Sequence, residues 1–274
     1  MRLAIALVLA LFPLRALAQD MQLTRASDDC HTMLRTGSGV TYTKVCISST
    51  GNVTSYESPA GVEHIRVRDP LEGYRVCRAD DWSPLWDSGV DDAGAQETII
   101  HQPNGANTLP LRITRIGFGG LKLVQDFSFT TRAYGPAELT VQMKVYNTGQ
   151  VTLPHVMVQR FFDADINGTL PNHAFVRAST AAVLIPGGDG RVQPGARGLS
   201  LSAGILDKPH WANEGLYESL LLYIESGEPS DCNAGAVEFG GSAQPSDKLG
   251  VVTYGVGDIL PGRVKTVSFI YRRF

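Results

Sequence analysis

The sequence predicts an all-β protein, an antiparallel β-sandwich built as one large unit or two fused units, with little helix. The first observation is alternation: in Leu139–Tyr146 the apolar residues occupy every second position, so they share one face of a strand. The second is that 29 glycines and 15 prolines lie mostly between such segments, where turns are needed. The third is that no fixed-period repeat occurs, which disfavours a propeller or a solenoid.

The N-terminal 18 residues have the pattern of a secretory signal peptide. Met1-Arg2 is basic, residues 3–12 are apolar, and Ala16-Leu17-Ala18 offers a cleavage site. Pro13 and Arg15 make the apolar run too short to span a bilayer as a helix. We therefore expect cleavage after about Ala18 and a secreted or periplasmic protein. Residues 19–274 are expected to form a single unit, with 186–198 as the place for a sub-boundary.

Composition excludes several function classes for the processed chain. Without residues 1–18 it has 256 residues and a formal charge of −5, because Arg2 and Arg15 leave with the leader. An acidic protein has no electrostatic reason to bind nucleic acid or anionic membranes. No later apolar run approaches 18 residues, so we expect no transmembrane segment in the mature chain.

Four cysteines indicate two disulfides in an oxidising compartment. Three pairings are open, and we favour Cys30–Cys46, which closes a short loop, with Cys77–Cys232, which joins distant segments. The alternative is that one pair stays reduced and buried. No C-x-x-C spacing indicates a redox motif or a zinc site.

The expected elements follow the alternation along the chain. Leu139–Tyr146 and a strand over about 155–166 flank the turn at 147–150, so we expect a hairpin there. A short helix is considered over 209–223, although Gly215 weakens it. Further strands are expected at 40–48, 62–68, 109–118, 121–130, 174–185, 198–205, 220–225, 250–256 and 263–272.

The best candidate for a bound metal follows the strand at 155–166. Asp163, Asp165, Asn167 and Thr169, with a glycine at 168, match the first half of a calcium loop. The second half does not match, because Pro171 and Ala174 occupy the later ligand positions. Two alternatives remain open: the aspartates only end the strand and pair with Arg160 or another base, or they act as a carboxylate pair in glycoside hydrolysis.

The same segment carries a family resemblance over about residues 62–185. A strand, the Asn147-Thr148-Gly149 turn, and a second strand ending in Arg160-x-x-Asp163-x-Asp165 resemble a group of bacterial secreted β-sandwich proteins. Those proteins often have an aromatic residue between the two aspartates, where this chain has Ala164. The group has no assigned activity, so the resemblance implies a fold and a location only.

A second candidate site is the acidic segment 80–92, expected to be loop-like, which contains Trp82 and Trp86. Exposed indole faces beside carboxylates suit sugar binding, whereas the alternative is that both tryptophans cap the core. The six histidines form no close metal-binding pair, and no nucleophile-elbow, P-loop or dinucleotide motif occurs.

Together these features favour a non-enzymatic binding or structural protein, with one Ca²⁺ ion as a candidate cofactor and a carbohydrate or a protein as its partner. The alternative is a carbohydrate-active protein: a mutarotase-like or glycosidase sandwich, or a sugar-binding domain. Whether the chain is an enzyme stays open at this point.

Overall fold

The computed structural model describes ten segments of the chain, namely residues 30–65, 72–78, 85–87, 92–132, 135–163, 175–177, 182–186, 198–204, 210–216 and 248–274. These residues form three antiparallel sheets, which confirms the predicted all-β sandwich class. The helices among them are two one-turn 3₁₀ segments, Gly39–Thr41 and Phe118–Gly120. None of the helices in these segments is long and apolar enough to cross a bilayer.

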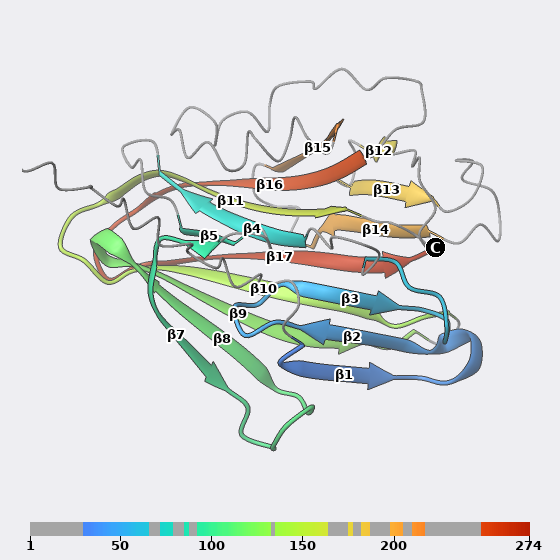
Figure 1. Cartoon of the computed structure of the whole chain (residues 1–274). Helices are drawn as coiled ribbons and strands as arrows, with labels where there is room; N and C mark the ends of the chain where they lie inside the picture. Colours follow the sequence, from blue (N-terminus) through green and yellow to red (C-terminus); the bar gives the residue numbers. More distant parts are fainter. Residues whose placement is uncertain are drawn as a thin grey trace, which may run out of the picture.

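The three sheets have three, eight and six strands (Figure 1). The three-stranded sheet has the order β1 (Thr32–Thr36), β2 (Thr43–Ile47) and β3 (Val53–Glu57). The eight-stranded sheet has the order β12 (Phe175–Arg177), β13 (Ala182–Pro186), β14 (Gly198–Ala203), β17 (Val264–Arg273), β10 (Glu138–Asn147), β9 (Leu121–Thr130), β8 (Leu111–Gly117) and β7 (Ala95–His101). The six-stranded sheet has the order β15 (His210–Leu216), β16 (Lys248–Ile259), β11 (Leu153–Asp163), β4 (Glu72–Cys77), β5 (Leu85–Asp87) and β6 (Asp92–Ala93).

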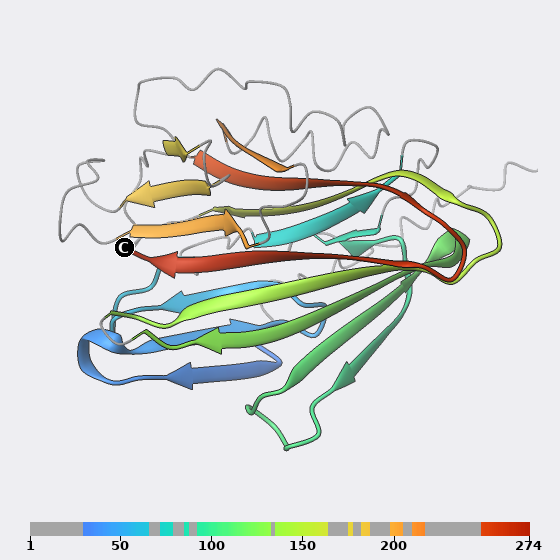
Figure 2. The same ribbon diagram turned by 180° about the vertical axis from the view of Figure 1, so that it is seen from behind.

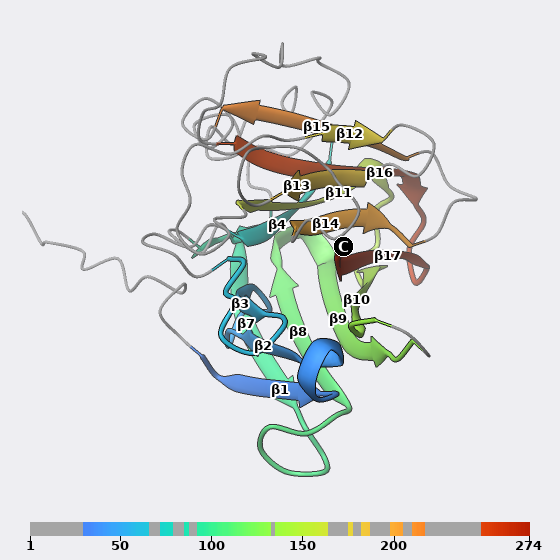
Figure 3. The ribbon, with the colours of Figure 1, turned by 90° about the vertical axis from the view of Figure 1, so that its right-hand side faces the viewer.

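All three sheets contribute to one apolar core. In β10 the predicted row Leu139, Val141, Met143 and Val145 is fully buried, and the residues between them are more exposed. The three-stranded sheet lies across β8, β9 and β10 in Figure 1, and Figure 2 shows this arrangement from behind. Seen from the side in Figure 3, β4, β11, β16 and β15 lie above β1 and β2.

The predicted hairpin around residues 147–150 is wrong, although both of its strands exist. β10 pairs with β9 and β17, whereas β11 pairs with β4 and β16 in the other large sheet. The chain therefore crosses from one sheet to the other at this turn. β16 and β17 make the same crossing, and the two crossings meet at Asn147, whose backbone bonds to Arg263 and Gly262.

The side chain of Asn147 also stabilises the point where the two crossings meet. It is 1% exposed, and its amide donates to the carbonyls of Val151 and Ile259 over 2.8 Å each. Its side-chain oxygen accepts a bond from the Gly149 amide. The asparagine that the sequence places in a tight hairpin turn therefore joins two inter-sheet crossings instead.

Three other local expectations are corrected. The described part of the strand expected at 62–68, residues 62–65, forms no strand and makes only an isolated bridge from Glu63 to Glu57. Residues 210–216, considered as part of a helix, form β15 and pair along their whole length with β16. Residues 85–87, expected in a loop, form β5 and pair with β4. In the last two cases hydrogen bonding to a distant strand overrides the local pattern. The strand expected at 220–225 lies outside the residues that the structure describes, and so does most of the segment 186–198 where a sub-boundary is expected, namely residues 187–197.

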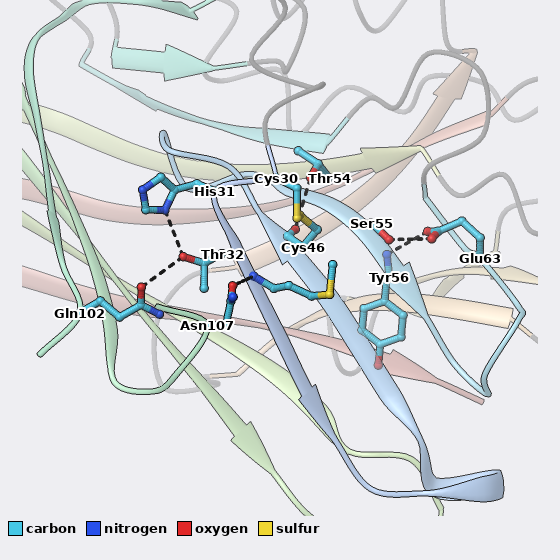
Figure 4. The surroundings of a disulfide bond; sticks show 11 residues. Cys30, His31, Thr32, Cys46, Thr54, Ser55, Tyr56, Glu63, Gln102 and Asn107 are labelled. Carbon is cyan, nitrogen blue, oxygen red and sulfur yellow. Dashed lines mark hydrogen bonds between the residues drawn. A yellow bond between two sulfur atoms is a disulfide. The ribbon is translucent and has the colours of Figure 1, made fainter. Parts of the chain in front are cut away.

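The predicted Cys30–Cys46 disulfide is present and joins the start of β1 to β2, with the two Cα atoms 5.4 Å apart (Figure 4). Cys77 is also disulfide-bonded. Cys232, its predicted partner, lies outside the described residues. The Cys30–Cys46 bridge cross-links β1 to β2 within the three-stranded sheet, which shares the apolar core with the larger sheets.

Candidate functional site

The turn that joins β2 to β3, residues 48–53, lies inside the protein. Ser48, Asn52 and Val53 are at most 1% exposed, and Thr50 is 9% exposed. Turns normally run over the surface, because their backbone groups need water or another partner. A buried turn therefore requires the surrounding sheets to supply its hydrogen bonds.

Part of this requirement is met within the turn. The Ser48 hydroxyl accepts bonds from the backbone amides of Thr50, Gly51 and Asn52 at 2.9–3.3 Å. Gly51 has φ of +102°, a conformation that favours glycine. A Cβ atom at Gly51 would lie 2.2 Å from Nε2 of Gln125, so this position is closed to a side chain on both grounds.

The carbonyls of the turn are bound by side chains from both large sheets. Arg160 Nη2 donates to the Gly51 carbonyl over 3.0 Å. The Tyr74 hydroxyl and Gln125 Nε2 both donate to the Thr50 carbonyl, over 3.0 and 3.1 Å. Since Arg160 and Tyr74 belong to the six-stranded sheet and Gln125 to the eight-stranded one, the turn bridges the two.

Glu72 and Asp87 supply the acceptors. A Glu72 carboxylate oxygen accepts the backbone amide of Val53, and Asp87 Oδ1 accepts Asn52 Nδ2 over 2.6 Å. Both acids lie on the six-stranded sheet and are at most 2% exposed. Side-chain donors thus bind the carbonyl groups of the turn, and the carboxylates of Glu72 and Asp87 accept its N–H groups.

Behind the turn, these residues form an ionic network. Arg160 Nε lies 2.7 Å from Glu72 Oε1, and Arg160 Nη1 donates to Gln125 Oε1 over 3.0 Å. The Tyr271 hydroxyl donates to the same Glu72 oxygen and accepts from Arg160 Nε. Tyr271 comes from β17, so this group also connects the two large sheets.

A second buried arginine contacts the Tyr74 and Asp87 side chains that bind the turn. Arg115 of β8 is fully buried, donates to the Tyr74 hydroxyl over 2.9 Å, and lies 3.6 Å from Asp87 Oδ2. It also forms an ion pair with Asp92. We name Glu72, Tyr74, Asp87, Arg115, Gln125, Arg160 and Tyr271 the turn-binding cluster.

Burial governs the charge states in this cluster. Burial raises the pKa of the Glu72 carboxyl, and the positive charge of Arg160 opposes that rise. Burial also raises the pKa of Tyr271 well above its ordinary value, so this phenol stays neutral. Burial alone would lower the pKa of Arg160, but Glu72 and Tyr271 raise it, so the guanidinium stays charged.

The predicted site residues that the structure describes lie on the other face of the six-stranded sheet. Asp163 ends β11 and is 4% exposed, and Trp86 of β5 is 6% exposed and opposite Arg75 in the register. Asp165, Asn167, Thr169 and Trp82 lie outside the described residues, so the calcium ligands and the tryptophan pair stay predictions. Within the described part, no three His, Cys, Asp or Glu side chains are grouped to hold a metal.

Of the alternatives left open for the aspartates, pairing of Asp163 with Arg160 is wrong. Arg160 shares the core-facing row of β11 with Val158 and Phe162, whereas Asp163 faces the opposite way. The sequence did contain a signal for Arg160, because a cation interrupts an otherwise apolar row. Glu72, Tyr74 and Asp87 were missed because they lie on strands that the alternation did not reveal.

The described surface carries two further features, an ion cluster and a hollow. The outward face of the eight-stranded sheet carries an ion cluster in which Asp126 binds Arg112 through both carboxylate oxygens and Lys144 through one, at 2.6–3.0 Å. Beside it, Lys122 Nζ lies 4.4 Å from the centre of the Tyr146 ring. A hollow of about 320 Å³ is lined by Thr36, Gly37, Thr41, Thr131, Arg132, Gly135 and Ala137.

Comparisons with known proteins add little about this site. No family model and no curated protein matches the chain. Among 52 matching chains of solved structures, one titled polysaccharide lyase is 11% identical, with a TM-score of 0.45. The match covers 87% of this chain but 33% of the lyase chain, so this chain spans about a third of that protein. At this similarity the match identifies no function.

Proposed function

We propose that this chain is an exported, non-enzymatic binding or structural β-sandwich module. The observation that carries the proposal is the closure of the turn-binding cluster. Its interior members Glu72, Arg160 and Tyr271 are at most 2% exposed, and their polar atoms bind each other and the turn at 48–53. A catalytic group must reach a substrate, whereas these groups hold the protein's own backbone.

Export is supported by two independent features. The leader-like segment 1–18 favours secretion or a periplasmic location, and the Cys30–Cys46 disulfide needs an oxidising compartment to persist. The test is expression with the native N-terminus, followed by mass spectrometry of the protein recovered outside the cytoplasm. We expect a first residue at about Gln19 and no free thiol at Cys30 or Cys46; a cytoplasmic, uncleaved product would contradict export.

The non-enzymatic part is tested by comparing turnover with binding. The purified chain is incubated with a panel of polysaccharides and synthetic glycoside and ester substrates, and the same panel is used in a binding array. We expect saturable binding to at least one macromolecule without turnover. Turnover that is abolished by a substitution at one site would contradict the proposal.

Calcium binding belongs to this proposal as its metal-dependent part. Its support is the Asp163-x-Asp165-x-Asn167-Gly168-Thr169 sequence and the position of Asp163 at the end of β11. Calorimetry and thermal unfolding with millimolar Ca²⁺ test it, with Asp165→Asn as the variant. We expect a rise in melting temperature for the native chain only; an equal rise for both would contradict this site.

One observation favours a second candidate function, carbohydrate binding. The outward face of β8, β9 and β10 presents exposed Arg112 together with half-exposed Asp126, Lys144 and Tyr146. Guanidinium, carboxylate and ammonium groups beside an aromatic ring suit hydroxyl-rich ligands. A glycan array with the native chain and the Tyr146→Ala variant tests it, and binding that is unchanged in the variant would exclude this face.

A further inference from the structure

We propose that one end of the sandwich docks onto the surface of an anionic lipid bilayer. The described segments leave seven large apolar side chains exposed, and four of them lie at this end. They are Phe118 (52% exposed), Val151 (76%), Leu260 (57%) and Val264 (44%), and we name them the apolar tip. Val264 begins β17, and the other three lie in loops. The docking surface goes beyond the proposed function, which names no lipid.

The loops of the apolar tip come together in space although they are far apart in the sequence. They join β8 to β9, β10 to β11 and β16 to β17, and all three lie at the left in Figure 1 and at the right in Figure 2. The amide and the hydroxyl of Thr148 both donate to the Gly120 carbonyl, over 2.7 and 2.8 Å. The Gly262 amide donates to the Asn147 carbonyl over 2.9 Å. These bonds hold the three loops as one surface, so their apolar side chains are presented together.

The stability of the fold does not explain why these positions are apolar. Loop positions are normally filled by polar or turn-forming residues, because water covers them. A side chain as exposed as Val151 buries little area, so it contributes little to the hydrophobic stabilisation of the core. Exposed apolar side chains that gather on one surface mark a place where something other than water covers the protein.

Basic and aromatic groups adjoin the apolar tip. Lys122, Tyr146 and Val264 are neighbours in one register row across β9, β10 and β17, and Lys122 Nζ lies 4.4 Å from the centre of the Tyr146 ring. Arg263, which precedes Val264, is exposed. Lysine, arginine and tyrosine next to apolar side chains are the combination that suits the headgroup region of a bilayer.

The balance of charge at this end differs from that of the whole chain. The processed chain has a formal charge of −5, which by itself predicts no attraction to anionic membranes. Salt screens charges beyond about 8 Å at physiological ionic strength, so a docked surface responds to the charges close to it. Among the described residues at this end, the bases are Arg78, Lys122, Arg263 and Lys265, and the acids are Glu97, Asp258 and Asp92, of which Asp92 is paired with the buried Arg115. The local balance is therefore positive.

Two other occupants suit this surface less well. A second copy related by a two-fold axis would bring Lys122 and Arg263 of one copy against the same cations of the other, and like charges oppose association. A hydroxyl-rich ligand needs hydrogen-bonding groups and flat aromatic faces, and the side chains of Val151 and Leu260 offer neither. An anionic bilayer matches both features, because its headgroups pair with the cations while the apolar side chains enter the acyl boundary.

The test is flotation of the processed chain, residues 19–274, with lipid vesicles. One set of vesicles is phosphatidylcholine alone, and the other is phosphatidylcholine mixed with phosphatidylglycerol. We expect saturable binding to the anionic vesicles and weaker binding to the zwitterionic ones. High salt should weaken binding to the anionic vesicles, because it screens the attraction between the cations and the headgroups.

Two matched valines separate docking at this end from non-specific adhesion. Val151→Ser should weaken binding to the anionic vesicles roughly tenfold, because an apolar side chain no longer leaves water on docking. Val40→Ser is the control, because Val40 is 74% exposed but lies in the β1–β2 connection at the opposite end (Figure 1). Its carbonyl accepts a bond from Arg273, which ends β17. The control should bind like the native chain.

Two further variants test the apolar and the basic contributions separately. Phe118→Ser/Leu260→Ser should weaken binding to the anionic vesicles by roughly a hundredfold or more, since two large side chains are lost. Arg263→Ser should weaken it roughly fivefold, as expected for one basic residue near a charged lipid surface, and should leave binding to the zwitterionic vesicles unchanged. Circular dichroism shows that each variant is folded.

Four results would overturn the inference. The first is a folded native chain that binds neither kind of vesicle, and the second is equal binding to both kinds. The third is an equal effect of Val151→Ser and Val40→Ser. The fourth is a dimer of the native chain, seen by light scattering without lipid, that Phe118→Ser/Leu260→Ser dissociates, since the apolar tip would then be covered by a second copy.

Discussion

Arg160 and Glu72 form an ion pair inside the protein, with Arg160 Nε 2.7 Å from Glu72 Oε1 and neither residue more than 2% exposed. Both lie on the six-stranded sheet, yet their remaining bonds reach the other two sheets. Arg160 binds Gln125 and the Gly51 carbonyl, and Glu72 binds Tyr271 and the Val53 amide. Through these bonds the pair connects all three sheets of the fold.

Arg160→Met should strongly destabilise the protein. The substitution keeps most of the apolar volume but leaves Glu72 buried without its cation, which costs about 3–5 kcal/mol. Urea unfolding at pH 7 measures the loss. The double variant Arg160→Met/Glu72→Gln should lose less than the sum of the two single variants, because neither charge then remains unpaired. Additive losses would show that the pair is not coupled.

Gly51→Ala should cost about 2 kcal/mol or more in the free energy of unfolding. The new Cβ must tolerate a positive φ and also displace Gln125 from the Thr50 carbonyl. Gly61→Ala is the matched control, because Gly61 also has a positive φ but no atom within 4 Å of a Cβ. An equal loss of unfolding free energy in the two variants would mean that the close contact with Gln125 adds nothing to the cost at Gly51.

Asn147→Ala should destabilise the protein by about 1–3 kcal/mol. It removes three hydrogen bonds at the crossing between sheets and leaves the buried Ile259 carbonyl without that donor. Asn104→Ala serves as the control, since Asn104 is exposed and donates one bond to the Leu109 carbonyl. Thermal unfolding of both variants should show a shift for Asn147→Ala only.

Asp126 should give the stability a pH dependence at the acidic end. Partial burial works against ionisation, but Arg112 and Lys144 hold the pKa of Asp126 below its ordinary value of 3.8. Because the folded pKa is depressed, the contribution is present above pH 3.8 and is lost as the pH falls through the folded pKa. Asp126→Asn should cost about 0.5–1 kcal/mol at pH 7, the range for a surface pair.

The measurement for Asp126 is urea unfolding of both proteins between pH 2 and 7. The difference between the native chain and Asp126→Asn should shrink at the acidic end, whereas Glu97→Gln, an exposed control on β7, should differ little at any pH. A difference that grows on acidification would contradict the assigned direction.

Removing the N-terminal disulfide should cost about 3 kcal/mol. Cys30 and Cys46 are separated by 16 positions, and closing a loop of that length restricts the unfolded chain by roughly this amount. Cys30→Ala/Cys46→Ala is compared with the native chain by urea unfolding under non-reducing conditions, where the disulfide of Cys77 is kept. A loss below about 1 kcal/mol would show that packing of β1–β3 does not depend on the cross-link.

The sequence by itself determined the strand class, several strand positions and which residues face the core. Leu121–Thr130 is a strand with the expected bounds, and the row from Leu139 to Val145 is buried as the alternation requires. The cysteine count and short spacing also led to the Cys30–Cys46 bridge. These features follow from local chemistry, because side-chain direction alternates along any strand regardless of its partners.

Only the tertiary structure decided which strands pair and what the interior polar groups do. The sequence around Asn147 predicts a hairpin turn. Its hydrogen-bond partners Ile259 and Arg263, however, are more than 100 positions away along the chain. From their sequence neighbours alone, Glu72, Gln125 and Arg160 are simply charged or polar residues. Their hydrogen-bonding role arises only because a turn from the N-terminal sheet packs between the two large sheets. Such contacts are set by the summed burial and hydrogen bonding of the whole fold, which no short stretch of sequence encodes.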